Sequence, residues 1–165
     1  MICNMVKIYL ICGKICSGKT YYSKELAAEK NAIILSCDEL SRIIDRNVSI
    51  DSDKYDIIAK ELQSYLFRRA AEISKYGVDV ILDWGFWTER DRISASEFFS
   101  ENGCKTEWHY IDVSEEQLRK NIEKRNASLS DSEYFVDEGL LEKCLSRFEV
   151  PSKDFIDVWK TINGG

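Results

Sequence analysis

The chain reads Gly13-Lys14-Ile15-Cys16-Ser17-Gly18-Lys19-Thr20 directly after the apolar run 7–12, KIYLIC. This stretch matches the pattern G-x-x-x-x-G-K-[ST], in which glycines let the backbone curl and aim successive N–H groups at phosphate oxygens. The pattern arises by chance in fewer than about one in a hundred chains of this length. The apolar strand expected before it and the helix expected after it are the setting that phosphate binding needs. The sequence therefore predicts a P-loop whose eight residues all contact a nucleotide.

Two side chains of this stretch and one strand-end carboxylate predict ATP with Mg²⁺ as the ligand. Lys19 is expected to neutralise the β and γ phosphates, and Thr20 to offer its hydroxyl to the metal. Asp83 ends the apolar run 78–83, VDVILD, where a carboxylate can complete the magnesium shell. A solvated strand-end carboxylate is the alternative for Asp83. Thr20 and Asp83 are the predicted metal ligands.

A second carboxylate, Asp38, lies two residues after the apolar run 32–36. Strand ends of a parallel sheet meet at one edge, so Asp38 is expected to face the γ phosphate and act as a catalytic base. Its alternative role is to cap the following helix.

Two arginines that flank a helix leading into the irregular segment from Asn126 onward predict a lid over about 119–137. Arg119 and Arg125 would both bind the triphosphate, with Arg125 and Lys19 stabilising the transferred phosphoryl group. A solvated helix face is the alternative, since Lys120, Glu123 and Lys124 lie alongside.

Apolar runs alternate with helical patterns along residues 1–165, which predicts one α/β domain with a parallel five-stranded sheet between helices. Residues 46–53 and 126–137 are expected to be irregular. The expected strands cover 7–12, 32–36, 78–83, 105–113 and 155–160, and the expected helices 19–29, 38–44, 55–76, 88–103, 114–125 and 138–148.

Composition excludes several classes of protein. The net charge of -6 argues against general coating of nucleic acid. No segment approaches the length of a membrane span, and the start of the chain lacks the features of a signal peptide. The six cysteines include no Cys-x-x-Cys pair, so reduced thiols and a cytoplasmic location are expected. His109, the one histidine, is expected to be a core residue.

With these residues in place, the chain resembles the P-loop kinase group that includes the 5′-kinase domains of polynucleotide kinases, chloramphenicol phosphotransferases and zeta toxins. The resemblance rests on GKICSGKT, SCDEL, LDWGFWTERDR, HYIDV with the helix ending in KRN, and RFEVPSKD. It implies a nucleoside-kinase-like fold, a base at Asp38, a lid arginine such as Arg125, and an adenine near Pro151. Polynucleotide kinases usually have an aspartate pair with arginine close behind, whereas this chain has Asp38-Glu39 and Arg42.

Two functional hypotheses follow. The favoured one is a phosphotransferase that moves the γ-phosphate of Mg-ATP to a hydroxyl of a small molecule, a nucleoside or, less favoured, a nucleic-acid end. The alternative is an ATP-binding regulatory or switch module with weak ATPase activity, because the same loop holds phosphate in such proteins.

Overall fold

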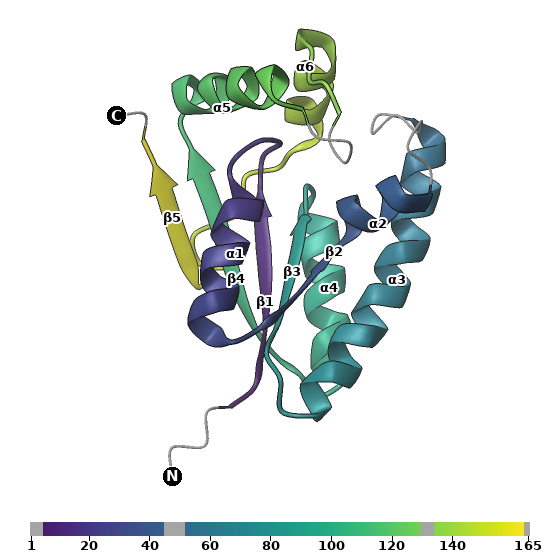
Figure 1. Cartoon of the computed structure of the whole chain (residues 1–165). Helices are drawn as coiled ribbons and strands as arrows, with labels where there is room; N and C mark the ends of the chain where they lie inside the picture. The colour runs from purple at the N-terminus through teal and green to yellow at the C-terminus, as the bar shows by residue number, and fades with distance from the viewer. Residues whose placement is uncertain (1–4, 45–51, 130–133, 164–165) are drawn as a thin grey trace.

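The computed structural model describes residues 5–44, 52–129 and 134–163. Five parallel strands form one sheet in the order β2-β3-β1-β4-β5 (Figure 1). Their bounds are β1 Lys7–Gly13, β2 Ile33–Ser36, β3 Val80–Gly85, β4 Lys105–Val113 and β5 Val158–Ile162. The predicted α/β fold with a parallel five-stranded sheet is confirmed.

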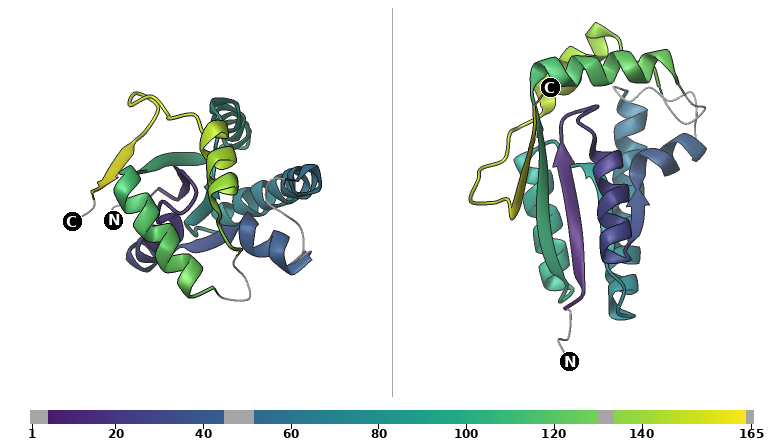
Figure 2. Two further views of the ribbon diagram at one scale, coloured as in Figure 1. Left: turned by 90° about the horizontal axis from the view of Figure 1, so that it is seen from above. Right: turned by 60° about the vertical axis from the view of Figure 1, so that its left-hand side comes forward.

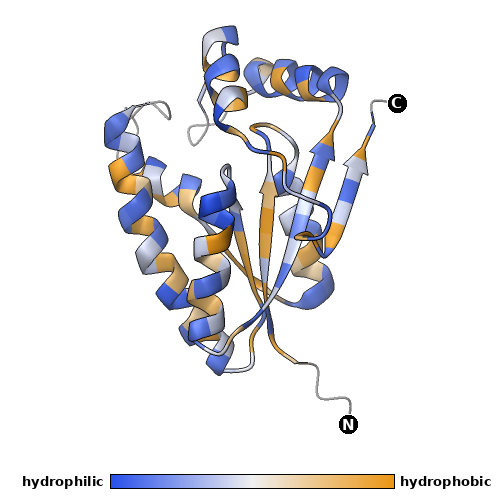
Figure 3. Ribbon diagram, turned by 180° about the vertical axis from the view of Figure 1, so that it is seen from behind, coloured by the Kyte–Doolittle hydropathy of each residue, from blue (hydrophilic) through white to orange (hydrophobic). Residues whose placement is uncertain are grey.

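Helices cover both faces of the sheet and the end at which its strands stop (Figures 1 and 2). On one side lies α1, on the other lie α3 and α4, and α5 and α6 lie above the carboxyl ends of the strands. The helix bounds are α1 Lys19–Lys30, α2 Cys37–Ile44, α3 Asp53–Lys75, α4 Glu89–Glu101, α5 Glu115–Ala127 and α6 Glu138–Arg147. In Figure 3 these helices carry blue and orange bands in alternation, as expected when one face is buried.

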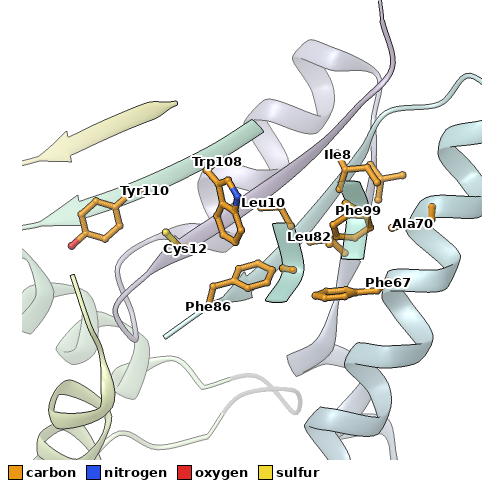
Figure 4. Close-up of a cluster of buried hydrophobic side chains, with 13 residues drawn as sticks. Ile8, Leu10, Cys12, Phe67, Ala70, Leu82, Phe86, Phe99, Trp108 and Tyr110 are labelled. Carbon is orange, nitrogen blue, oxygen red and sulfur yellow. The ribbon is translucent and has the colours of Figure 1, made fainter. Parts of the chain in front are cut away.

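The central strand β1 contributes side chains to two hydrophobic clusters, because successive side chains of a strand point to opposite faces of the sheet. Ile8 and Leu10 pack with Phe67 of α3 and Phe99 of α4, in the cluster drawn in Figure 4. Tyr9 and Ile11, together with Leu26 of α1, form the cluster on the other face. A third cluster lies beneath α5 and α6 and contains Ile15, Val113, Leu118, Ile122, Val136, Leu141 and Cys144. The P-loop is thereby anchored between a packed sheet and the helices above it.

The last strand is shifted from its predicted place. Residues 155–160 were expected to be extended, but β5 runs from Val158 to Ile162. The backbone N–H of Asp157 donates to the carbonyl of Trp108, while the Asp157 carboxylate accepts from the Trp108 N–H. Before β5 begins, the backbone N–H of Phe155 donates to the carbonyl of Ser152 and closes a turn. These contacts fix where pairing with β4 begins, and apolar content alone does not encode them.

Other boundaries move by one or two residues. Helix α3 begins at Asp53 because the Ser52 side chain caps it, accepting from the backbone N–H of Tyr55. Residues 45–51, most of the loop predicted at 46–53, lie outside the described residues. The irregular segment predicted at 126–137 is shorter, because α5 continues to Ala127; within it residues 130–133 are also outside the described part.

Two further expectations bear on the chain as a whole. The five described cysteines form no disulfide with one another, and Cys3 lies outside the described residues. His109 is 3% exposed, with its ring nitrogens on Tyr22 and Glu107, so the expected core histidine is confirmed. Within residues 5–44, 52–129 and 134–163, no helix combines the length and apolarity needed to cross a bilayer.

Candidate active site

The P-loop follows β1 directly, and its backbone has positive φ angles and a close contact that favour glycine. Cys16 and Gly18 have φ angles of 56° and 95°, in the left-handed region that glycine adopts without strain. A Cβ placed on Gly13 would lie 2.7 Å from Oγ of Ser17 and 3.0 Å from the carbonyl oxygen of Ile111. Ser17 is fully buried, and within the described part of the chain its Oγ has no hydrogen-bond partner. The loop is therefore curled as the motif requires, and it keeps one buried hydroxyl for a polar ligand.

Lys19 begins α1 and folds back over the loop. Its Nζ donates to the carbonyl oxygens of Gly13 at 3.0 Å and Lys14 at 2.6 Å. Burial lowers the pKa of Lys19 from its ordinary value, while the nearby Asp83 and Asp38 carboxylates act in the opposite direction. A poorly solvated cation at this position makes phosphate an energetically favourable partner.

Thr20 and Asp83 are in direct contact, as the metal-site prediction needs. The Thr20 hydroxyl donates to Oδ2 of Asp83 at 2.9 Å. Asp83 is 7% exposed and lies in β3, two residues before the strand ends at Gly85. Burial raises the pKa of Asp83, whereas Lys19 and the Thr20 hydrogen bond lower it. Among the described residues no group of three or more His, Cys, Asp or Glu side chains is arranged around a metal. A magnesium ion on Thr20 and Asp83 would therefore need ligand oxygens as well, which suits a nucleotide phosphate.

Asp38 lies in the first turn of α2 and is held by α3. The Tyr55 hydroxyl donates to Oδ1 of Asp38 at 2.7 Å. Burial, and next the Asp38 charge, raise the pKa of Tyr55 above its ordinary value of 10.0, so this donor keeps its proton at neutral pH. The side chain that accepts from the first turn of α2 belongs to Ser36, on the N–H of Glu39 at 3.4 Å. The described hydrogen bonds thus give Asp38 a Tyr55 contact and no capping bond.

Helix α5 is tied to the P-loop by two residues one turn apart. Asn121 donates to the carbonyl oxygen of Cys16 at 2.9 Å, and Arg125 approaches the Cys16 sulfur at 3.2 Å. The Arg125 guanidinium also lies 4.4 Å from the ring centroid of Tyr134. Arg125 therefore contacts the P-loop. Asn121, which also contacts the loop, and Tyr134, which packs against Arg125, were not identified from the sequence.

Arg119 lies elsewhere, contrary to prediction. Its guanidinium pairs with Glu115 and Glu138 at 3.3 Å, and about half of the side chain is exposed. Residues Gln117, Asn121, Lys124, Arg125 and Ser128 line the cavity over the P-loop, and Arg119 does not. Two residues along a helix are about 200° apart around its axis, so Arg119 and Asn121 cannot share a face. In this structure Arg119 therefore lies outside the candidate site.

One cavity of about 1200 Å³ joins the predicted residues. Residues 15–20 of the P-loop line it together with Asp38, Tyr55, Asp83 and Arg125. Gly13 and Lys14 contribute carbonyl groups to Lys19 rather than surface to the cavity. Pro151, which the resemblance placed near adenine, lines a separate cavity of about 390 Å³ with Glu149 and Ser152. One cavity thus brings together P-loop residues 15–20, the Thr20–Asp83 pair and Asp38.

A family model described as an AAA domain, AAA_33, matches residues 8–151. The chain belongs to this AAA-domain family. The matched region of this chain includes the P-loop, Asp38, Asp83 and α5. The P-loop kinase-like grouping expected from the sequence is confirmed at this level. No curated protein sequence matches the chain.

Solved structures of low sequence identity share the fold. A candidate kinase from Chloroflexus aurantiacus has a TM-score of 0.71 and 19% identity, over 96% of this chain and 85% of that one. Kti12 from Chaetomium thermophilum, solved with ADP-AlF3, has a TM-score of 0.69 and 16% identity, over 94% and 88%. A chain of the Pnkp1/Rnl/Hen1 RNA repair complex has a TM-score of 0.66 and 18% identity, over 87% and 44%. The AAA-domain protein therefore has the nucleotide-binding fold of P-loop kinases.

Proposed function

We propose that the protein is a phosphotransferase that moves the γ-phosphate of Mg-ATP to a hydroxyl of a small molecule, a nucleoside or a nucleic-acid end. One observation carries the proposal: Asp38, held by Tyr55, shares a single cavity with Lys19, Thr20 and Asp83. A nucleotide-binding loop alone needs no carboxylate of this kind.

The nucleotide and metal fit the residues present. The curled loop and the buried Ser17 hydroxyl suit a triphosphate, and Lys19 supplies the positive charge beside it. Thr20 and Asp83 offer two oxygen ligands for Mg²⁺. When bound, the ion neutralises charge on the phosphate oxygens. Arg125 and Asn121 hold the far side of the loop through Cys16.

Asp38 would act as the base in the transfer. Its carboxylate takes the proton of the acceptor hydroxyl while the acceptor oxygen forms a bond to the γ phosphorus. The bond from that phosphorus to the bridging oxygen breaks, and ADP leaves. Lys19 and Arg125 balance the negative charge on the transferring group. The protein would thus contribute a base, positioning and charge stabilisation, without forming a covalent bond to the phosphoryl group.

The regulatory alternative remains a hypothesis, in which ATP is bound and slowly hydrolysed for the benefit of a partner. The Asp38–Tyr55 hydrogen bond favours the enzyme, because it fixes a carboxylate that lines a cavity extending beyond the P-loop. A single P-loop kinase-like domain over 1–165, a lid at about 119–137 and a cytoplasmic location stay predictions.

The test compares two products of one reaction. γ-labelled ATP is incubated with the protein, magnesium and a panel of acceptors: nucleosides, 5′-hydroxyl oligonucleotides, sugars and hydroxylated antibiotics. We expect ADP formation to rise with one acceptor and to equal the labelled acceptor formed. Slow release of free phosphate that no acceptor changes would favour the switch module.

A further inference from the structure

The cavity extends well beyond the P-loop, into a space that we call the acceptor slot, between α3 and the start of α4. It is lined by Lys60, Gln63, Phe67, Trp84, Phe86, Arg90 and Ser94. From Tyr55 to Phe67 the lining residues of α3 span about 18 Å of helix. Pockets for one small ligand occupy about 300–1000 Å³, whereas this cavity has about 1200 Å³. There is thus room for a second molecule beside a nucleotide.

The floor of the acceptor slot is aromatic. The rings of Phe67 and Trp84 have centroids 5.9 Å apart, and those of Trp84 and Phe86 are 6.2 Å apart with 32° between their planes. Phe67 lies opposite Phe86 in Figure 4, with centroids at 6.4 Å. Phe67 and Phe86 are almost completely buried, while Trp84 is only half-buried. Trp84 is therefore the most exposed of these three rings and the one that a ligand in the cavity can reach.

The rim of the slot is polar. Among described residues neither Gln63 nor Ser94 forms a side-chain hydrogen bond, and neither Lys60 nor Arg90 forms an ion pair. The acids nearby are already engaged, since Asp56 pairs with Arg147 at 3.2 Å and Asp91 accepts from the backbone N–H of Thr88. The slot thus presents one aromatic face with donors and acceptors at its edge.

We propose that the acceptor slot binds a planar aromatic or heteroaromatic ring, which stacks on Trp84 with its polar edge toward Gln63 and Ser94. This inference rests on the proposed function in one respect: the ring belongs to the phosphate acceptor, whose hydroxyl then reaches Asp38. A flat π-system gains stacking energy when it packs on an aromatic ring. An aliphatic polyol packed on Trp84 would gain no such stacking energy, and its hydroxyls would lose their hydrogen bonds to water.

Binding, rather than transfer, tests the slot. The protein is saturated with magnesium and a non-hydrolysable ATP analogue, and ligand affinity is measured by saturation-transfer NMR. Two matched pairs differ only in the ring: thymidine against methyl 2-deoxyriboside, and phenyl glucoside against methyl glucoside. We expect the ring-bearing member of at least one pair to bind about tenfold more tightly than its partner. Equal binding within both pairs, or no binding by any of the four, would overturn the proposal.

Two variants locate the binding. Trp84→Leu removes the aromatic face and should weaken ring binding about tenfold, whereas Trp84→Phe keeps a ring there and should stay within about threefold. Binding of the ATP analogue, unchanged in both, shows that each variant is folded. Ring binding that survives intact in Trp84→Leu would contradict the assignment. Because no phosphate is transferred, failure of the slot and failure of the kinase proposal are separate results.

Discussion

The phenolic oxygen of Tyr55 lies 2.7 Å from Oδ1 of Asp38, and this hydrogen bond joins α3 to α2. It connects side chains 17 residues apart and fixes one oxygen of the carboxylate that we propose as the base. The neutral phenol donates without adding a charge, so the carboxylate stays oriented and free to accept a proton on its other oxygen.

Tyr55→Phe should therefore lower kcat about tenfold and leave KM for ATP within about twofold, because the donor is lost but the P-loop is untouched. Steady-state kinetics at saturating acceptor measures both constants. Tyr65→Phe is the matched control, since Tyr65 is on the exposed face of the same helix. A higher KM for ATP with an unchanged kcat would show that Tyr55 serves nucleotide binding instead.

The two arginines of α5 should differ sharply. Arg125→Ala is expected to lower the transfer rate at least about a hundredfold, since Arg125 contacts the P-loop and would stabilise the transferred group. Arg119→Ala should change the rate less than about twofold, because it removes only exposed ion pairs. Single-turnover transfer measures both variants. Equal losses would mean that α5 rotates before the reaction.

Asp83 gives a pH dependence with a definite sign. Burial raises the pKa of Asp83 above its ordinary value of 3.8, so the folded protein holds this proton to higher pH than the unfolded chain does. Its ionisation then opposes folding as pH rises from about 3.8 through the folded-state pKa. Urea unfolding without magnesium should show the wild type losing stability relative to Asp83→Asn over that range. A difference that stays flat from pH 4 to 7 would contradict the burial of an ionised Asp83.

Asp83→Asn should also weaken binding of Mg-ATP about tenfold while changing magnesium-free binding of ATP much less. Calorimetric titrations with and without magnesium separate the two effects. Equal weakening under both conditions would place Asp83 outside the metal shell.

His109, in β4 on the face of the sheet that α1 covers, predicts the opposite pH behaviour. Burial lowers the pKa of His109 below its ordinary value of 6.5, against the attraction of Glu107. A depressed folded-state pKa contributes stability that is complete above 6.5 and declines as pH falls through the folded pKa. Chemical unfolding of the wild type should show this decline, and His109→Gln should lack it. The same decline in the variant would assign it to another group.

The sequence predicted those parts of the site that lie in one continuous stretch or directly at a strand end. Residues 13–20 are readable because the glycine spacing sets the backbone and the motif names the side chains. Asp38 and Asp83 follow from the rule that ligands bind at the carboxyl ends of parallel strands. Those three features meet in one cavity.

Contacts between distant helices were not readable. Tyr55 reaches Asp38 only because α3 begins at Asp53 and packs beside α2, and no local pattern marks that tyrosine. Asn121 looked like any polar residue of an exposed helix, although it binds the backbone of Cys16. Distinguishing Arg125 from Arg119 required knowing which face of α5 is turned toward the P-loop, and the charges of the two side chains do not show this. A face-by-face reading of that helix would have separated the two.

Asp38→Asn tests the central claim most directly, when γ-phosphate transfer and ATP binding are measured on the same preparation. The account predicts that the variant binds Mg-ATP with an affinity within about threefold of the wild type, because Asp38 lies outside the P-loop. Transfer to the acceptor should fall at least about a hundredfold, because the base is lost. Transfer at the wild-type rate by Asp38→Asn, with ATP binding intact, would contradict the account.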